Sequence, residues 1–277
     1  MGWLDLLARK PSADTSVAEH MSNAYDAASR GDYRAALAIW TPLGHAGVAR
    51  AQSNIGACFS EGLGVERDPK LAERWLLLAS EGGDPIGQRN LATLYFKGDG
   101  VEQDNERAAT LYRAAAEQGD AQAQDMLSWM LIEGDGIAVD HADARRWAEA
   151  AADQGVAASM TRLGMIFHNA LGVERNAGQA AAWWERGAAL GDADGQAMLG
   201  AAYQLGAGVK KDPIAAMTWL LRARAGGSAL ATQFFGAARA ALGADQFAEA
   251  ERRAQQQHDI DPEFPRHQAK SILNGGR

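Results

Sequence analysis

The residue types that could do chemistry in this chain are short glycine loops, six histidines and a single cysteine, Cys58. A loop such as Gly62-Leu63-Gly64-Val65 could bind phosphate through its backbone N–H groups, but a nucleotide-binding loop follows a strand and occurs once per site. Here the loop follows a helical pattern and recurs along the chain. The sequence has neither His-Glu-x-x-His, typical of zinc enzymes, nor Gly-x-Ser-x-Gly, typical of serine hydrolases. We therefore predict no enzyme, no cofactor and no metal site.

Cysteine content and charge narrow the class of protein further. One cysteine permits no intrachain disulfide and no metal site made of cysteines. The formal net charge of -8 argues against nucleic acid as the partner, because binding phosphates requires clustered Lys and Arg. No stretch approaches the roughly 20 apolar residues that span a bilayer, and no signal-peptide pattern occurs. We therefore expect a cytoplasmic protein.

The glycine loops belong to a pattern that recurs every 36 residues. The first copy is Glu61–Trp75, and its Gly-x-Gly loop at 62–65 recurs at 98–101, 134–137, 170–173 and 206–209. A period of this length indicates a stack of repeats rather than two globular domains. The alanine-rich composition favours closely packed helices over a sheet.

Each copy predicts a pair of helices. The first helix carries an apolar residue, a small residue beside it and another apolar residue four positions on, as in Ile55, Gly56 and Phe59. This spacing places both apolar side chains on one face, and the small residue lets a neighbouring helix approach. The first helix should end at the loop glycine, and the second should bury Ala72, Trp75 and their equivalents. The expected N-caps of the second helices are Asp68, Asp104, Asp140, Asn176 and Asp212.

These residues resemble the Sel-one-like repeat family, which is related to tetratricopeptide repeats. The shared pattern is Leu-Gly-x-x-Tyr, Gly-x-Gly-Val, Asp, Ala and Trp, and it covers roughly residues 48–228. The resemblance implies an all-α, right-handed superhelical solenoid of antiparallel helix pairs. It also implies a role in scaffolding, signalling or host interaction. The cysteine-rich secreted members carry paired cysteines in each repeat, which this chain lacks.

We expect the stack to have atypical ends. The expected segments are a short amphipathic segment at 1–12, an atypical first helix pair at 13–47, five repeats at 48–83, 84–119, 120–155, 156–191 and 192–228, a C-terminal capping helix pair at 229–258, and a linker and tail at 259–277. Pro42 should kink or end the second helix of the atypical pair. Met1–Lys10 carries Trp3 and three leucines. It could cap the solenoid or dock on a membrane or a partner, and both interpretations stay open.

A protein or peptide partner is expected in a groove lined by the first helices. The resemblance to tetratricopeptide repeats points to the positions between the packing residues. The candidate partner-binding residues are Asn54, Asn90, Phe96, Met126, Trp129, Arg162, Met165, His168, Asn169, Met198 and Gln204. An aromatic anchor such as Trp129 with polar neighbours such as Arg162 is typical of an interface hot spot. The alternative is that the curvature of the stack buries Trp129 against the neighbouring helix.

The fourth repeat departs most from the pattern. Val156 replaces an N-cap, Ala170 replaces a loop glycine and Gly187 replaces an alanine. Because an alanine in the left-handed conformation costs on the order of 1 kcal/mol, we expect this loop to change shape, with Asn169 as the new cap. The irregularity is explained either by drift or by accommodation of a partner.

Three functions follow from these observations. The first is a non-enzymatic adaptor, scaffold or regulator that binds a protein segment in the groove. The second is a membrane-associated scaffold that docks through residues 1–10. The third is an enzyme with an unrecognised site near His168 and Asn169, although no activating base, metal set or cofactor loop accompanies them. Self-association through an uncovered end of the stack is a further alternative for any of the three.

Overall fold

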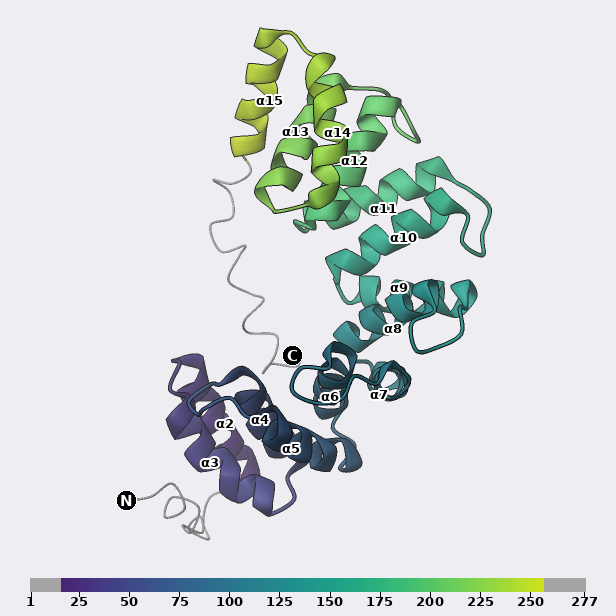
Figure 1. The fold of residues 1–277 in the computed structure, drawn as a ribbon. Helices are drawn as coiled ribbons and strands as arrows, with labels where there is room; N and C mark the ends of the chain where they lie inside the picture. The colour runs from purple at the N-terminus through teal and green to yellow at the C-terminus, as the bar shows by residue number, and fades with distance from the viewer. Residues whose placement is uncertain (1–15, 257–277) are drawn as a thin grey trace. The chain divides into compact units, whose positions relative to one another are not determined.

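The computed structural model describes residues 16–256, and the expected segments 1–12 and 259–277 lie outside that range (Figure 1). All regular structure in the described range is helical. The described residues form two compact units. The N-terminal unit consists of 16–123 with 135–138, and the C-terminal unit of 124–134 with 139–256.

Helices of nearly equal length follow one another as pairs. The N-terminal unit contains α2 (Val17–Ser29), α3 (Tyr33–His45), α4 (Ala49–Glu61), α5 (Pro69–Glu81), α6 (Pro85–Lys97) and α7 (Asn105–Glu117). The C-terminal unit contains most of α8 (Ala121–Glu133), followed by α9 (His141–Asp153), α10 (Ala157–Asn169), α11 (Ala177–Ala189), α12 (Ala193–Leu205), α13 (Pro213–Ala225), α14 (Ala229–Ala240) and α15 (Ala244–Gln256). The first helices of the five repeats are α4, α6, α8, α10 and α12, and the second helices are α5, α7, α9, α11 and α13.

The loop between the two helices of a repeat is closed by the N-cap of the second helix. In the first repeat, the Asp68 N–H donates to the Phe59 carbonyl at 2.9 Å. The Asp68 side chain then accepts from the N–H groups of Lys70 and Leu71. The other predicted caps accept in the same way, and they are Asp104, Asp140, Asn176 and Asp212. The predicted caps are therefore confirmed.

The second glycine of each loop has a role that the sequence analysis missed. It lies against the first turn of the second helix of the preceding repeat. A Cβ atom on Gly208 would lie 2.0 Å from the carbonyl oxygen of Ala177, and one on Gly100 would lie 2.6 Å from the Pro69 side chain. A spacing this short leaves no room for a side chain, so the glycine sets how closely successive repeats can stack.

Inside a repeat, the small residue of the first helix faces a large residue of the second. A Cβ atom on Gly56 would lie 2.6 Å from the Leu76 side chain, and one on Gly164 would lie 2.2 Å from the Trp184 indole. Leu76 and Trp184 are buried, whereas Trp75, which we expected in the core, is only half-buried. The prediction is confirmed for Ala72 and for Trp147, the equivalent of Trp75 in the third repeat, while in the first and fourth repeats the buried large residue is one position further along.

The expectation for the loop of the fourth repeat is wrong, and Pro42 does not have one of the two effects expected of it. Ala170 adopts the left-handed conformation (φ 57°, ψ 40°), so the loop of the fourth repeat keeps its shape and Asn169 remains the last residue of α10. Hydrogen bonds on both sides hold this loop, from the Leu171 N–H to the Ile166 carbonyl and from the Asn176 N–H to the Phe167 carbonyl, each at 3.0 Å. Pro42 does not end its helix, because α3 continues to His45.

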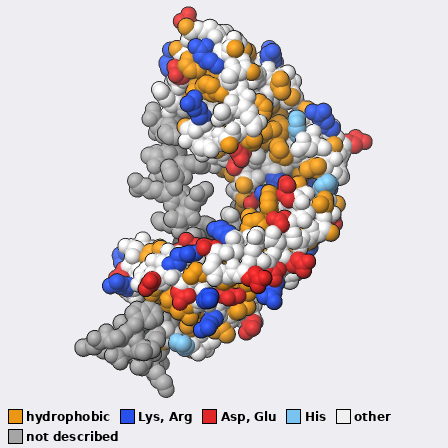
Figure 2. Space-filling model, viewed as in Figure 1, with side chains coloured by type: hydrophobic (Ala, Val, Ile, Leu, Met, Phe, Trp, Pro, Cys, Tyr) orange, Lys and Arg blue, Asp and Glu red, His pale blue; other side chains and the backbone are white. Residues whose placement is uncertain are grey.

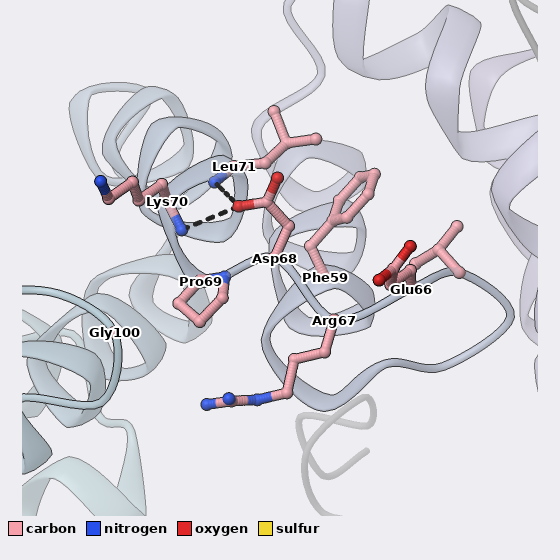
Figure 3. Close-up of a pocket in the computed structure, with 9 residues that line it drawn as sticks. Phe59, Glu66, Arg67, Asp68, Pro69, Lys70, Leu71 and Gly100 are labelled. Carbon is pink, nitrogen blue, oxygen red and sulfur yellow. Dashed lines mark hydrogen bonds between the residues drawn. The ribbon is translucent and has the colours of Figure 1, made fainter.

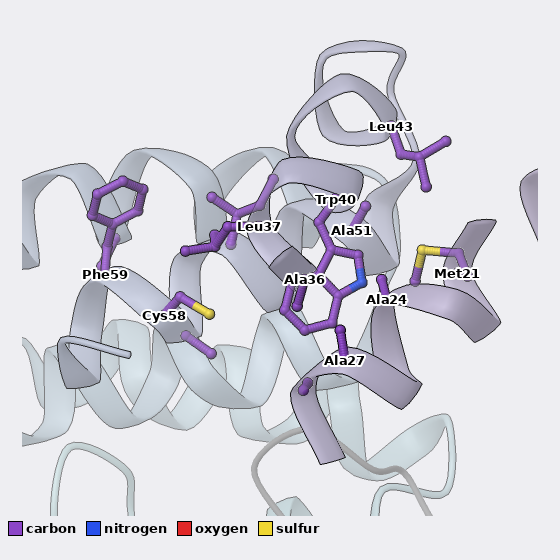
Figure 4. Close-up of a cluster of buried hydrophobic side chains, with 14 residues drawn as sticks. Met21, Ala24, Ala27, Ala36, Leu37, Trp40, Leu43, Ala51, Cys58 and Phe59 are labelled. Carbon is purple, nitrogen blue, oxygen red and sulfur yellow. The ribbon is translucent and has the colours of Figure 1, made fainter. Parts of the chain in front are cut away.

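The atypical first pair has its own core and a polar outer surface. Trp40 of α3 is fully buried among Met21, Ala24 and Ala51 (Figure 4). In the middle and last turns of α2 the exposed residues are Ser22, Asn23, Asp26 and Ser29, and the exposed Arg30 follows the helix. A polar outer face is what a terminal repeat needs for solubility. No helix between residues 16 and 256 is long and apolar enough to cross a membrane.

Candidate partner-binding face

The candidate partner-binding residues lie on the first helices, and each unit has its own set. We call the set Asn54, Ala57, Ser60, Asn90, Thr93 and Phe96 the N-terminal face; it lies on α4 and α6. We call the set Met126, Trp129, Ile132, Arg162, Met165, His168, Met198, Ala201 and Gln204 the C-terminal face; it lies on α8, α10 and α12. Residues three apart on a helix point to the same side, so each helix contributes a row of three side chains.

The N-terminal face is polar and partly closed. Asn54 is 1% exposed, and its Nδ2 donates to the Tyr25 hydroxyl of α2 at 3.3 Å. Thr93 shares a 2.9 Å hydrogen bond with the Tyr112 hydroxyl of α7. Asn90 and Phe96 are half-buried. At 1% exposure, Asn54 offers no surface to a partner in this conformation.

The C-terminal face has an apolar centre and is more open. Met126, Trp129, Met165 and Met198 are each half-buried. Met165 and Met198 pack on a core that includes Trp184 and Leu199. Each of these side chains therefore has one side on the protein interior and another that water or a partner can reach. A methionine side chain is unbranched and polarizable, so it can adapt its shape to different contacts.

Arg162 is held by an ion pair instead of standing alone on this face. Its Nη1 donates to the Asp125 carboxylate and also to the Asp125 carbonyl oxygen, the latter at 3.1 Å. Ser159 donates to the same carboxylate oxygen at 2.5 Å. The side chains of Arg162 and Asp125 are only 15% and 12% exposed. The pair therefore ties α10 to α8 and leaves the face without a net charge at this point.

The remaining candidates lie toward the C-terminal ends of the first helices. His168 is half-buried against Trp184, with ring centroids 5.4 Å apart. Gln204 is half-buried and Asn169 is exposed. The next residue of α12, Leu205, is 73% exposed, and sequence reasoning did not single it out. Its only signal in the sequence was a leucine where the other repeats have Glu61, Lys97, Glu133 and Asn169.

The groups that could do chemistry are packed away or scattered. Burial raises the pKa of the Cys58 thiol to about 12, so this group is not a thiolate nucleophile at neutral pH. Within residues 16–256 no three His, Cys, Asp or Glu side chains are grouped so that they could hold a metal ion. Acidic and basic side chains are interspersed over the visible surface (Figure 2).

A hollow of about 710 Å³ lies beside the loop of the first repeat (Figure 3). It belongs to the N-terminal unit and is separate from the residues of both faces. Its walls are formed by Phe59, Val65, Glu66, Arg67, Asp68, Pro69, Lys70, Leu71 and Gly100.

Comparison with protein families gives one match. The model of the Sel1 repeat matches at 49–84, 85–120, 121–156, 157–192 and 193–228, which is more than half of the chain. The matched segments contain both faces described above. A comparison with curated proteins gave no match.

Solved structures with the same architecture are similar over most of this chain. A Sel1 repeat protein from Oxalobacter formigenes is 30% identical with a TM-score of 0.74, and the match covers 87% of this chain and 98% of that protein. The protein c5321, a protective antigen of uropathogenic Escherichia coli strains with an SLR fold, is 28% identical with a TM-score of 0.73. That match covers 88% of this chain and 54% of c5321, so this chain spans about half the length of c5321.

Proposed function

We propose that this chain, which belongs to the Sel1 repeat family, binds a protein segment on its C-terminal face. Sel1 repeat proteins are generally protein-interaction modules. The finer proposal is that this member is a non-enzymatic adaptor, scaffold or regulator in the cytoplasm. Membrane docking through residues 1–10 falls outside the described residues, and nothing described favours it.

The observation that carries this proposal is a row of half-buried apolar side chains across three neighbouring helices, namely Met126 and Trp129 of α8, Met165 of α10 and Met198 of α12. Interfaces are enriched in aromatic residues and methionine and depleted in charge at their centres. Trp129 would be the anchor, because large aromatic side chains dominate the binding energy of most interfaces. Methionines beside it would adjust to the shape of the partner.

Polar side chains next to this row would form the rim of the interface. Gln204 and Asn169 can donate and accept hydrogen bonds, and His168 adds a ring nitrogen. A polar rim around an apolar centre is the usual anatomy of a protein interface. Because Arg162 is paired with Asp125, we expect it to orient α10 instead of contacting the partner through its charge.

Site-specific photocrosslinking in the native cell tests the proposal. A benzophenone side chain at position 198 should capture a partner, whereas one at position 90, the same register in the N-terminal face, should not. The captured partner is then purified and its affinity for the chain is measured. Trp129→Ala should weaken binding at least tenfold, and Thr93→Ala, its counterpart in the N-terminal face, less than twofold.

Circular dichroism first establishes that both variants are folded. Equal capture at positions 90 and 198 would contradict the assignment to the C-terminal face. So would unchanged affinity in a folded Trp129→Ala variant. A charge reversal at Arg162 is a poorer test, because it would place two carboxylates together and unfold the region.

A further inference from the structure

The polar outer surface of the first helix pair belongs to α2, and α3 carries an apolar stripe beside it. The stripe consists of residues spaced at i, i+4, i+7 and i+11, which lie on one side of a helix. They are Ala35, Ile39, Pro42 and Ala46, the last of which directly follows α3. Ala35, Ile39 and Pro42 are half-buried, and Ala46 is exposed. We call these four residues the α3 stripe.

The repeats show what this side of a second helix contacts. Ile39 holds in α3 the position that Trp75 holds in α5, 36 residues further on. Trp75 packs on the preceding second helix, with its ring centroid 5.1 Å from that of His45 in α3. Trp183 and Trp219 likewise pack on apolar clusters that include residues of the preceding second helix. A preceding second helix therefore covers this side in the repeats.

The α3 stripe lacks this cover within residues 16–256, because no second helix precedes α3 there. The neighbouring surface of α2 does not suit a complete extra repeat. In a regular repeat the third residue of the first helix is small and meets the preceding second helix, as where a Cβ atom on Gly87 would lie 2.6 Å from the Ala79 Cβ. In α2 that residue is Glu19, which is exposed. A suitable cover is therefore narrow and lies on α3 alone.

We propose that residues 1–10 of this chain cover the α3 stripe. The stripe is about 16 Å long, and a helix of ten residues is about 15 Å long. In such a helix Trp3, Leu6 and Leu7 would share one side, because they are spaced at i, i+3 and i+4. The segment thus offers an apolar side of the length that the stripe requires. The contact is independent of binding at the C-terminal face.

The connection to α2 begins where the stripe ends. Residues 11–15 join the segment to α2 and can span about 17 Å. In the first repeat, a Cβ atom on Gly82 would lie 2.7 Å from the Cβ of Ala49, the first residue of α4. The counterparts of these two residues in the first pair are Ala46 and Val17, so the start of α2 lies beside the end of the stripe. The tether therefore holds the segment within reach.

A tethered segment fits the stripe better than a separate chain does. A stable interface between separate chains takes roughly 20–30 residues from each partner, and the stripe has only four side chains. A short tether gives a segment an effective concentration on the order of millimolar, so a small contact suffices.

A nitroxide label on the full-length chain tests the placement. Asp5→Cys provides the labelling site on the side of the segment opposite Trp3, and Cys58 is fully buried and will not react. In ¹⁵N NMR the label should reduce the amide signals of residues 39–46 to less than half of their intensity after reduction of the nitroxide. The signals of residues 111–118, the same positions in α7, should keep about nine-tenths of theirs.

Two substitutions of one residue show whether the stripe holds the segment. Pro42→Glu places a charge in the stripe, and Pro42→Ala keeps it apolar. Both remove a proline from inside α3, so the helix should stay folded in both. Pro42→Glu should recover at least half of the lost intensity, and Pro42→Ala should recover none. The matched control Leu78→Glu, at the same position in α5, should also recover none.

Three other results would overturn the proposal. The first is full intensity at residues 39–46 in the labelled chain, or an unchanged loss in a folded Pro42→Glu variant. The second is equal broadening of an unlabelled ¹⁵N chain by a labelled ¹⁴N chain, which would assign the contact to a second copy. The third is recovery of these signals on adding vesicles of phosphatidylcholine and phosphatidylglycerol that sediment with the full-length chain and not with a chain lacking residues 1–10. That result would assign the segment to a membrane.

Discussion

The N-terminal and C-terminal faces occupy the same helical positions but carry different side chains, polar in one and largely apolar in the other. In the N-terminal face, Asn54 and Thr93 are hydrogen-bonded to tyrosines of the same unit. In the C-terminal face, the same register carries methionine and tryptophan at half burial. The positions between the packing residues can thus change character from one unit to the other while the helix pairs keep their form. This difference is what makes one face a candidate for binding.

The scaffolds beneath the two faces are built alike. In the N-terminal unit Gln118 donates to Gln88 at 2.8 Å, and in the C-terminal unit Gln154 donates to Gln124 at 2.8 Å. Each bond joins the residue directly after the second helix of a repeat to the first turn of the first helix of the same repeat. The contrast between the faces therefore arises from side chains on the surface, and variants at matched positions can test it.

The largest difference should come from the ion pair beneath the C-terminal face. Arg162→Met leaves the nearly buried Asp125 carboxylate with Ser159 as its remaining side-chain partner, which should lower the free energy of unfolding by about 2–4 kcal/mol. The matched change in the N-terminal face, Asn90→Met, breaks no ion pair and should cost less than about 1 kcal/mol. Urea denaturation measures both.

A double variant separates the loss of the ion pair from the loss of packing. Arg162→Met with Asp125→Asn removes the buried charge, and it should recover at least half of the stability that the single variant loses. If the double variant is no more stable than Arg162→Met alone, then Arg162 stabilises the unit through packing, and the ion pair with Asp125 contributes nothing to stability.

The next effect concerns the small residue of the first helix. Gly164→Ala should cost roughly 2–3 kcal/mol, because the new Cβ would lie 2.2 Å from the rigid, buried indole of Trp184. Gly56→Ala should cost less, since the Leu76 side chain it meets can rotate. Gly236 is the control in the same register. A Cβ atom there meets nothing within 4 Å, so alanine should stabilise the protein by about 0.5–1 kcal/mol.

The three substitutions can be ranked by their effect on stability. Thermal unfolding of Gly164→Ala, Gly56→Ala and Gly236→Ala should give that order from most to least destabilised. If Gly56→Ala is as costly as Gly164→Ala, then the backbone approach between the helices is the limiting contact and the side chain opposite does not matter.

A smaller effect is a pH dependence of the free energy of unfolding that comes from Cys58 in the N-terminal unit. Burial raises the pKa of Cys58 from 9.0 to about 12, so the folded state keeps the proton where the unfolded state loses it. The unfolded state then binds fewer protons above pH 9, and stability falls as the pH rises. The loss should reach about 1.4 kcal/mol at pH 10. Cys58→Ala should lack this part of the decline between pH 8 and pH 10 in urea denaturation at each pH.

The sequence predicted the helix pairs and their caps because each depends on a local signal that recurs. Asp68 and its counterparts cap their helices by bonds to residues two or three positions away, so position alone identified them. The burial of Asn54 could not be predicted in this way. Its hydrogen-bond partner, Tyr25, belongs to the preceding helix pair, whose loop has a different length, so the 36-residue spacing does not place that partner.

Contacts between side chains that are far apart in the sequence could not be predicted either. Arg162 was expected to offer a polar contact, but its partner Asp125 lies 37 residues earlier, and only the stacking of α10 on α8 brings them together. Whether the candidate residues bind a partner remains a prediction for the crosslinking experiment.

The smallest effect compares the loops of the two units. Ala170 holds the left-handed conformation that Gly62 and Gly98 adopt in the N-terminal unit. A left-handed alanine is strained by its Cβ, whereas glycine is not, although glycine loses more entropy on folding. Ala170→Gly should therefore raise the free energy of unfolding by about 0.5–1 kcal/mol, and Gly62→Ala should lower it by a similar amount. Opposite shifts in the urea midpoint with an unchanged slope would locate the strain in this loop. If Ala170→Gly is destabilising, the fold of the C-terminal unit tolerates the strained loop at no cost, and its irregularity would then carry no information about binding.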